Sequence, residues 1–379
     1  MPRQSRNSQA MPIYMDRHDV SEEVTAKIVA QLHHEDLKIQ HKYNCRGLTY
    51  WFDDKRKTAF CLIEAPNKEA IQTMHNDAHG EVANRIIEVD GQIVESFLGR
   101  IEDPKKSQNT TLNIINDPAF RTIMVTTVKR LSFKKSTVKE LHSAVQAHNR
   151  AMSNTVHSHK GRIVRQETDY CLTSFDSVTN AVLCAIAINA KLEQTLHKLY
   201  GAHLKLNIGL SAGAPVTEKD GIFEDTIKSA ERISTIAQDK ITISSDVRDL
   251  YESENLNTTL DKQLVDTLSP ANESFLNFLM DFTEREWQNN TLSVDNFCKG
   301  LGYSKSQLYR KMMATTGKAP NGFIHDYRLD KALKLLEKKT ENISEVAFET
   351  GFNSPAYFSK CFSDKFGILP SKYALQYLY

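Results

Sequence analysis

A repeated pattern in the C-terminal part of the chain constrains its fold more than any other feature of the sequence. Each copy has a short apolar-patterned segment, a glycine, an aromatic residue, a polar capping residue and a second helix. The glycines are Gly302 and Gly351, and the hydroxyls of Ser304 and Ser354 can cap the second helices. A long helix from Pro320 joins the copies, so the pattern predicts two helix-turn-helix units. We expect the aromatic residues of the second helices to be core residues: Tyr309, Phe358 and Phe362.

Two such units joined by one helix would present two recognition helices on the same side of the domain. If both enter successive major grooves of DNA, they are separated by roughly 34 Å, one turn of the double helix. The whole chain has a net charge of only +1, so any basic surface has to be local. Residues 292–379 contain thirteen Lys and Arg against eight Asp and Glu, a net charge of +5, which favours contact with phosphates.

The second copy carries a long signature made of Ile343, Glu345-Val346-Ala347, Gly351-Phe352, Tyr357-Phe358-Ser359-Lys360, Phe362, Phe366-Gly367, Pro370-Ser371 and Tyr373. With this signature, residues 275–375 resemble the C-terminal domain of the AraC/XylS family of transcriptional regulators. The resemblance implies sequence-specific binding to double-stranded promoter DNA. A contact with RNA polymerase is a further expectation.

The same resemblance implies that DNA-binding residues lie on the second helix of each unit. In the first unit these are Ser304, Lys305, Ser306, Gln307, Arg310 and Lys311; in the second they are Asn353, Ser354, Ala356, Tyr357 and Lys360. The amides of Gln307 and Asn353 can each form two hydrogen bonds with adenine, so we expect them to read bases. Arg310, Lys311 and Lys360 are expected to contact phosphates.

Residues 12–97 alternate between strand-like and helix-like patterns. Segments 48–52, 58–63 and 85–89 are strand-like, and a further strand opens at residues 13–15. Two segments between them have apolar residues at helical spacing; Ser21 can cap the first helix, and the second begins at about Asn67. The resulting order, β-α-β-β-α-β, predicts a ferredoxin-like domain.

Histidine is concentrated in this N-terminal segment, which holds six of the thirteen in the chain. His75 and His79 are four residues apart on one helix, so both imidazoles can reach one ion. His33 and Asp36 share a face of the other helix, and Cys61 is on a strand. Nitrogen and sulfur ligands favour a transition metal such as Ni, Zn or Cu over Ca or Mg. The alternative is a set of surface and helix-capping histidines.

Four strings in this domain resemble a small bacterial family of ferredoxin-like domains, some of them described as nickel-binding. They are Met15-Asp16-Arg17-His18, Leu48-Thr49-Tyr50-Trp51-Phe52-Asp53, Ala59-Phe60-Cys61-Leu62-Ile63-Glu64-Ala65-Pro66 and His75-Asn76-Asp77-Ala78-His79-Gly80. The resemblance covers residues 12–90 and favours nickel as the ion. Our predicted ligands are His18, Cys61, His75 and His79, with His33 and Asp36 as further candidates.

The middle segment is patterned as a second α/β domain with strands at about 122–128, 161–164, 169–175 and 204–211. Its rhythm resembles the class III nucleotide cyclase domain, notably in Gly161-Arg162-Ile163-Val164, Leu206-Asn207-Ile208-Gly209 and Ala230-Glu231-Arg232-Ile233. A cyclase requires two carboxylates that hold metals at the triphosphate. Asp169 can be one, but the first strand, Met124–Val128, has no acidic residue. We therefore expect no catalytic residues and no enzyme, but a dimerisation or ligand-sensing domain.

These patterns predict a multidomain α+β protein with two α/β sandwich domains followed by an all-α double helix-turn-helix domain. The expected limits are a disordered tail at 1–11, a ferredoxin-like domain at 12–97 and a linker at 98–117. A degenerate cyclase-like domain at 118–252, a second linker at 253–270 and the DNA-binding domain at 271–379 follow.

The sequence as a whole predicts a DNA-binding transcriptional regulator controlled by a signal, such as nickel, that its N-terminal domains sense. A nucleotide cyclase fused to a DNA-binding domain and a metal-storage protein are the alternatives. Six scattered cysteines without a CxxC pair and the lack of a long apolar run predict a cytoplasmic protein with no membrane contact. The two α/β segments favour a homodimer.

Overall fold

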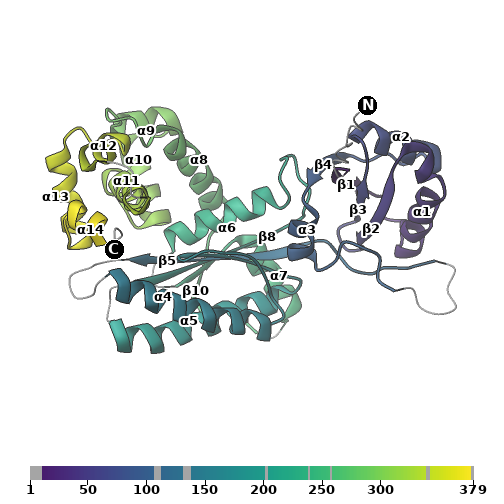
Figure 1. Ribbon diagram of the computed structural model, residues 1–379, viewed down its shortest axis with the longest axis horizontal. Coiled ribbons are helices and arrows are strands. Elements are labelled where there is room, and N and C mark those ends of the chain that lie inside the picture. Colours follow the sequence, from purple (N-terminus) through teal and green to yellow (C-terminus); the bar gives the residue numbers. More distant parts are fainter. Residues whose placement is uncertain are drawn as a thin grey trace, which may run out of the picture. The chain divides into compact units, whose positions relative to one another are not determined.

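The computed structural model describes residues 11–105, 112–130, 138–200, 204–237, 240–256, 258–338 and 342–376. The expected tail, except for Met11, lies outside these ranges. Two domains with β-sheets are followed by a helical domain (Figure 1), which confirms the predicted fold class. In the part of the chain that the structure describes, no helix is both long enough and apolar enough to cross a membrane.

The N-terminal domain has a four-stranded antiparallel sheet in the order β2-β3-β1-β4. Its strands are β1 Ile13–Asp19, β2 Arg46–Asp53, β3 Thr58–Glu64 and β4 Arg85–Val89. Its helices are α1 Ala26–Ile39, the 3-10 helix η1 Gln40–Tyr43, α2 Lys68–Ala78 and α3 Gly91–Leu98. The predicted order β-α-β-β-α-β is present, and α3 follows it.

The register of β1 and β3 determines which polar residues enter the core of this domain. Met15 pairs with Leu62 and His18 with Ala59, so Asp16 lies opposite Cys61. Side chains alternate between the two faces of a strand, so Asp16 and His18 share a face with Tyr14. Tyr14 is a core residue packed with Ile71 and Met74 of α2. The core face of the sheet therefore carries polar groups beside apolar ones.

Helices α1 and α2 both begin at a residue whose side chain caps the helix. The cap of α1 is not the residue that we predicted. Asn67 caps α2 as expected, and its side chain accepts a hydrogen bond from the backbone N–H of Ala70. Helix α1 is capped by Thr25 rather than by Ser21, because the threonine hydroxyl accepts from the N–H of Ile28. Residues 22–23 form a turn before the helix, so the acidic pair does not lie in its first turn.

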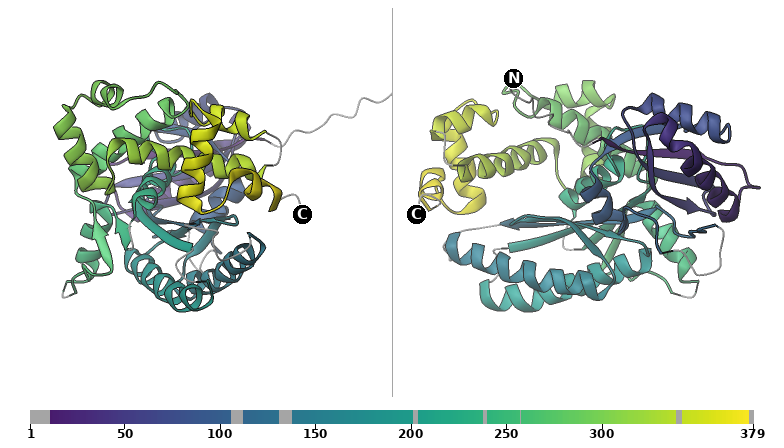
Figure 2. Two further views of the ribbon diagram at one scale, coloured as in Figure 1. Left: turned by 90° about the vertical axis from the view of Figure 1, so that its left-hand side faces the viewer. Right: turned by 45° about the vertical axis from the view of Figure 1, so that its right-hand side comes forward.

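The middle domain is built on a six-stranded sheet in the order β10-β9-β8-β5-β7-β6. Its strands are β5 Arg121–Arg130, β6 Arg162–Gln166, β7 Tyr170–Phe175, β8 Leu204–Gly213, β9 Ile241–Ile243 and β10 Val265–Thr267. Its helices are α4 Val138–Ser158, α5 Val178–Tyr200, α6 Glu224–Ile236 and α7 Ser245–Glu254. Helices α4 and α5 lie side by side along one face of the sheet (Figure 2).

Part of the predicted second linker, 253–270, belongs to this sheet instead. Val265 and Thr267 pair in parallel with Ile241 and Ile243, and the backbone N–H of Leu268 donates to the carbonyl of Ile243 at 3.0 Å. The polar, Asn- and Thr-rich composition concealed a strand of only three residues at the edge of the sheet. The helical C-terminal part of the chain follows directly after this strand, and its first helix, α8, begins at Pro270.

The chain divides into two compact units that do not coincide with the predicted domain limits. The first contains Met1–Thr122, Ser174–Asp176 and Ala212–Ile227, and the second contains the rest. Within the first unit, Arg17 of β1 donates to the carbonyl of Val216 at 3.3 Å, and Arg85 of β4 forms an ion pair with Asp220 at 2.8 Å. The loop after β8 is therefore part of the N-terminal unit.

His148 on α4 predicts a dependence of stability on pH. The residue is 6% exposed, and burial lowers the pKa of His148 to about 4. Between its unfolded value, about 6.5, and 4, the unfolded chain binds a proton that the folded chain excludes. This group therefore leaves stability unaffected at pH 8 and reduces the free energy of unfolding as the pH falls, by about 2 kcal/mol at pH 5.

The measurement is denaturant unfolding of the full chain and of a His148→Leu variant at pH 8 and at pH 5. The variant has no imidazole, so the loss of stability between the two pH values should be about 2 kcal/mol smaller than in the unmodified chain. An equal loss in both proteins would show that His148 does not resist protonation. The control is His157→Leu, because His157 is exposed on the same helix.

Among the residues that the structure describes, the C-terminal domain has seven helices. They are α8 Pro270–Glu286, α9 Val294–Leu301, α10 Lys305–Thr316, α11 Pro320–Glu337, α12 Ile343–Glu349, α13 Pro355–Phe366 and α14 Pro370–Gln376. Ser304 and Ser354 cap α10 and α13, and Gly302 and Gly351 have positive φ values of 72° and 77°. The two predicted helix-turn-helix units are α9–α10 and α12–α13.

In the second helix-turn-helix unit, aromatic side chains form the core as predicted. In the first helix-turn-helix unit, the prediction that Tyr309 is a core residue is wrong. Phe358 and Phe362 are fully buried, with ring centroids 5.8 Å apart. Tyr309 is 53% exposed. Leu308 and Met312 occupy the inward face of α10, and Tyr309 comes one position later, about 100° further around the helix. Tyr309 is therefore a surface residue of a recognition helix.

Candidate metal centre and nucleic-acid interface

Two groups of potential metal ligands meet in the core of the N-terminal domain. One contains Asp16, His18 and Cys61, and the other contains Asp36, His75 and His79. Within each group the ligand atoms lie within 4.8 Å of one another. Five of our six predicted ligands belong to these groups, namely His18, Asp36, Cys61, His75 and His79. The structure adds Asp16, which we did not predict.

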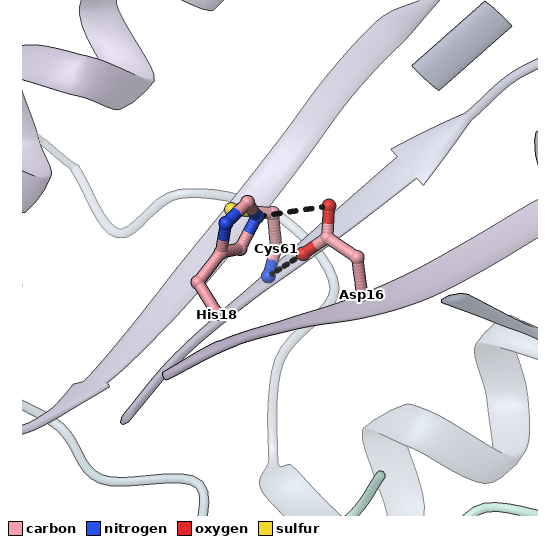
Figure 3. A group of neighbouring side chains, drawn as sticks. All are labelled: Asp16, His18 and Cys61. Carbon is pink, nitrogen blue, oxygen red and sulfur yellow. Dashed lines mark hydrogen bonds and ion pairs between the residues drawn. The ribbon is translucent and has the colours of Figure 1, made fainter. Parts of the chain in front are cut away.

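The strands hold the first group in place (Figure 3). The backbone N–H of Cys61 donates to Oδ1 of Asp16 at 2.8 Å, which fixes the carboxylate across the β1–β3 pair. Nε2 of His18 lies 3.5 Å from Oδ2 of Asp16, beyond a good hydrogen bond, and is a buried nitrogen without a partner among the described residues. A buried nitrogen in this position fits an additional ligand.

His75 connects the two groups. Its Nδ1 lies 3.0 Å from Oδ1 of Asp36, and its Nε2 lies 2.9 Å from Oδ2 of Asp16. All three side chains are buried, and Nε2 of His79 approaches the same Asp36 oxygen at 3.2 Å. The imidazole of His75 therefore bridges two buried carboxylates through its two ring nitrogens.

The charges of this network favour a cation. Burial opposes protonation of His75, but the hydrogen bonds that it donates to Asp16 and Asp36 outweigh this effect and raise the pKa of His75 to about 10. Burial would raise the pKa of Asp16, but His18 and His75 hold it well below its usual range. Burial and the two carboxylates raise the pKa of the Cys61 thiol. The pKa values of Asp16 and Asp36 are both lowered, so this centre contains two ionised carboxylates, which favour a cation.

His33 lies beside this centre but in neither group. Its Nε2 is 3.4 Å from Oδ2 of Asp103, and its ring is 4.9 Å from that of Tyr50. Asp103 is held in place because its backbone N–H donates to the carbonyl of Leu48 at 3.1 Å. The structure therefore pairs His33 with a carboxylate outside the two ligand groups, and of the predicted ligands it is the one set apart.

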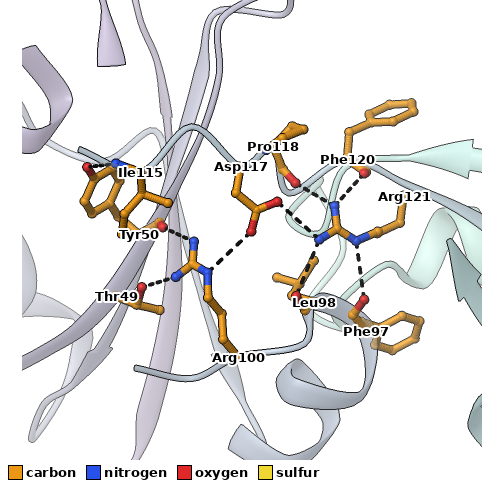
Figure 4. A network of polar contacts seen from close by, with 10 residues as sticks. All are labelled: Thr49, Tyr50, Phe97, Leu98, Arg100, Ile115, Asp117, Pro118, Phe120 and Arg121. Carbon is orange, nitrogen blue, oxygen red and sulfur yellow. Dashed lines mark hydrogen bonds and ion pairs between the residues drawn. The ribbon is translucent and has the colours of Figure 1, made fainter. Parts of the chain in front are cut away.

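The segment that holds Asp103 is the predicted linker 98–117, and its described residues are attached to the sheet (Figure 4). Arg100 donates to the carbonyl of Tyr50 at 2.6 Å and reaches Asp117 at 3.4 Å. The hydroxyl of Tyr50 donates to the carbonyl of Asn113 at 2.7 Å. Polar composition suggested a free connection, but the polar groups are used to fasten the segment along β2.

Asp16 is the site residue that the sequence analysis missed. It is 1% exposed, a burial that an aspartate seldom reaches without partners. Two signals pointed to it: its spacing of two from His18 on one strand, and its place inside the string Met15-Asp16-Arg17-His18. The position opposite Cys61 required the register, which the sequence does not specify.

The predicted DNA-binding residues lie on α10 and α13 or within two residues before these helices. Arg310 on α10 and Lys360 on α13 are exposed, as are Ser306 and Ala356. Ser354 is half-buried and Lys311 is partly covered, with its Nζ 5.4 Å from the rings of Phe275 and Tyr303. The exposed set also contains Tyr357, with 49% of its surface accessible.

Both residues that we expected to read bases already have partners within the protein. Oε1 of Gln307 accepts hydrogen bonds from the backbone N–H of Ser304 at 3.1 Å and from its hydroxyl at 2.9 Å. Nδ2 of Asn353 donates to the carbonyl of Asn290 at 3.2 Å. Gln307 thus completes a capping box, a role visible in its spacing of three from Ser304.

Several known proteins are similar to the C-terminal part of this chain. The family model for a helix-turn-helix domain matches residues 297–376. The "HTH-type transcriptional regulator MtrA" of Neisseria gonorrhoeae is 30% identical over 25% of this chain and 30% of its own length. The C-terminal domain is an AraC-type helix-turn-helix domain. The chain spans less than a third of the first curated relatives that it matches.

The N-terminal domain also matches a known family. The family model "Nickel responsive protein SCO4226-like" matches residues 14–89, the segment before the AraC-type domain that holds both ligand groups. The crystal structure of SCO4226 from Streptomyces coelicolor is similar, with 34% identity, 20% of this chain and 94% of that chain covered and a TM-score of 0.20. An "Adenylate/Guanylate Cyclase/Hydrolase" from Silicibacter pomeroyi is 20% identical over 38% of this chain and 86% of its own, with a TM-score of 0.33.

Proposed function

We propose that this chain is a DNA-binding transcriptional regulator whose N-terminal domain binds a transition metal ion, nickel above all. The observation that carries the proposal is the meeting of six donor residues, five of them buried, in one domain of a chain that also holds an AraC-type domain. The match to the nickel-responsive family supports the choice of ion. A storage role would leave the helix-turn-helix units without a purpose.

The donor set suits such an ion chemically. Carboxylate, imidazole and thiol groups are the ligands of borderline transition metals, whereas Ca²⁺ and Mg²⁺ require oxygen alone. Asp16 and Asp36 would balance the charge of a divalent ion. His18, His75 and His79 would supply neutral nitrogens, and Cys61 would bind as the thiolate after losing its proton. Before an ion binds, the imidazolium of His75 would keep the two carboxylates in place through its hydrogen bonds.

Electrophoretic or fluorescence titration of a promoter fragment, with and without Ni²⁺, tests the proposed regulation. We expect a change in DNA affinity that follows nickel occupancy. Equal affinity in both conditions would contradict control by nickel.

Formation of a cyclic nucleotide from ATP or GTP with Mn²⁺ would favour the enzyme alternative. A homodimer and a contact with RNA polymerase remain predictions; sedimentation at micromolar concentration tests the first.

The DNA interface is tested by an Arg310→Ala/Lys360→Ala double variant. These side chains are exposed at the two recognition helices and would lose contacts with phosphate or base. We expect specific DNA affinity to fall by about 1–3 kcal/mol for each contact that reads a base, and the salt dependence to weaken by about one ion for each phosphate contact. Lys338→Ala, an exposed lysine after α11, is the control and should bind normally. Unchanged affinity of the double variant would exclude this face.

A further inference from the structure

A cavity of about 150 Å³ lies in the second compact unit, away from the metal ligands. One wall has Lys129 at the end of β5, Lys205 and Asn207 on β8, and the end of α6. The other wall is formed by α11 and the turn before it, with the residues Lys318, Phe323, Asp326, Tyr327 and Asp330. Ile236 of α6 and Phe323 of α11 belong to one apolar core, which holds the two walls together.

Both aspartates of this cavity already have cationic partners. Asp326 forms ion pairs with Lys318 and, at 3.2 Å, with Lys365. Asp330 lies 2.6 Å from Nζ of the same Lys365. Lys365 is on α13, beside the lining rather than in it. Two lysines thus balance two carboxylates, so the acidic side chains leave no net negative charge at the cavity.

The remaining lysines make the cavity positive. With Lys129 and Lys205 the count is four lysines against two aspartates, an excess of two positive charges. Nζ of Lys129 donates to the carbonyl of Thr235 at 3.1 Å, a neutral partner that leaves its charge in place. Burial lowers the pKa of Lys129, and the nearby charges of Lys318 and Lys365 act in the same direction. An anion beside this ammonium group would offset both effects.

Asn207 determines which kind of anion fits. The residue is 2% exposed, and its Oδ1 is buried without a hydrogen-bond partner among the described residues. An unpaired buried acceptor is costly, and an anion that carries its own O–H group would satisfy it. Hydrogen phosphate has such a group, whereas sulfate has the same shape and no hydrogen near neutral pH. The cavity has roughly ten times the volume that one water needs, so a tetrahedral oxyanion fits.

We propose that this cavity binds hydrogen phosphate, with the anion between the ammonium groups of Lys129 and Lys318 and its O–H group donating to Oδ1 of Asn207. The bound ion would connect β5 and β8 to the turn before α11. The middle domain would then be a phosphate-binding domain. This proposal does not depend on the metal centre.

The test is a calorimetric titration of the metal-free full chain with phosphate and with sulfate at pH 8, where both ions carry about two negative charges. Phosphate should bind about tenfold more tightly, because sulfate leaves Oδ1 of Asn207 unpaired. Asn207→Leu should remove this preference. Methyl phosphate has an ester in place of that O–H group and should bind as weakly as sulfate, which separates free phosphate from a phosphate ester.

A second variant tests the positive charge. Lys318→Gln should weaken phosphate binding about tenfold, because one charged hydrogen-bond donor is lost. The side chain of Lys318 is 44% exposed, so this variant is expected to fold, and thermal unfolding checks that it does. Lys299→Gln is the control: Lys299 is exposed on α9, outside the lining, and its variant should bind phosphate normally.

The results that contradict the proposal differ from one another. Equal affinity for phosphate and sulfate, or tight binding of methyl phosphate, would overturn hydrogen phosphate as the ligand. A preference that Asn207→Leu retains, or an affinity that Lys318→Gln retains, would exclude this cavity. Absence of phosphate binding to the unmodified chain would overturn the site itself. Nickel binding is measured in a separate titration, so failure of one site is distinguished from failure of the other.

Discussion

The His75→Ala variant is expected to unfold with a free energy about 3–5 kcal/mol lower than that of the unmodified chain, and to lose tight nickel binding. His75 is 1% exposed and holds Asp16 and Asp36 through its two ring nitrogens. Removing one partner of a buried ion pair leaves a charge that is neither hydrated nor balanced, and here two carboxylates are affected. The same deletion removes the donor that lies between the two groups.

Denaturant unfolding and nickel titration of the same preparations measure both effects. His41→Ala is the matched control, because His41 is exposed on η1 of the same domain and belongs to neither group. A variant that is as stable as the control but binds no nickel would still support His75 as a ligand. A variant with unchanged nickel affinity would remove His75, and with it the connection between the two groups, from the metal centre.

Replacing Gly351 by alanine is expected to reduce the free energy of unfolding by about 2–5 kcal/mol, far more than the same change at Gly302. Both glycines have positive φ, which costs an L-residue roughly 1–2 kcal/mol. At Gly302 an added Cβ has open space, so that strain is the whole effect. At Gly351 the Cβ would lie 2.7 Å from the carbonyl oxygen of Trp287 and 2.9 Å from Nε of Arg328.

Those two atoms are hydrogen-bonded to each other at 2.7 Å, and Arg328 is a buried charge. The new methyl group would separate them, which adds about 1–3 kcal/mol of overpacking to the backbone strain. Thermal unfolding of both variants gives the comparison, with DNA affinity as a second measurement. Similar losses of stability for the two variants would show that the second unit absorbs the methyl group by a backbone shift.

The contrast between these glycines also shows what the sequence can predict. Their equivalent places between helix and cap were visible in the repeat, and positive φ follows from that place alone. The neighbour of Gly351 is Arg328, 23 positions away on α11, and nothing local specifies that contact. Local geometry was therefore predictable, and the tertiary contact that makes one copy sensitive was not.

The metal centre follows the same rule. The helical spacing of His75 and His79 and the family resemblance indicated most of the donors. Asp16 and the separation of His33 from the other ligands depend on strand register and on how residues 98–105 and 112–117 are attached to β2. The strand at 265–267 was hidden for a related reason: three residues are too few to show a period of two.

The hydrogen bonds that Gln307 and Asn353 make within the protein make the two recognition helices chemically different. The cap occupies Oε1 of Gln307 and leaves its NH₂ group, so the first unit offers a donor, which suits guanine O6 and N7 or thymine O4. Asn353 uses one N–H of its amide internally and keeps the other N–H and Oδ1, so it still offers both a donor and an acceptor. Gln307, whose Oε1 already accepts two hydrogen bonds, is therefore the amide that is less suited to pair with adenine through two bonds. We expect one chain to distinguish the two orientations of its operator, so that a reversed site in a promoter is a weaker site.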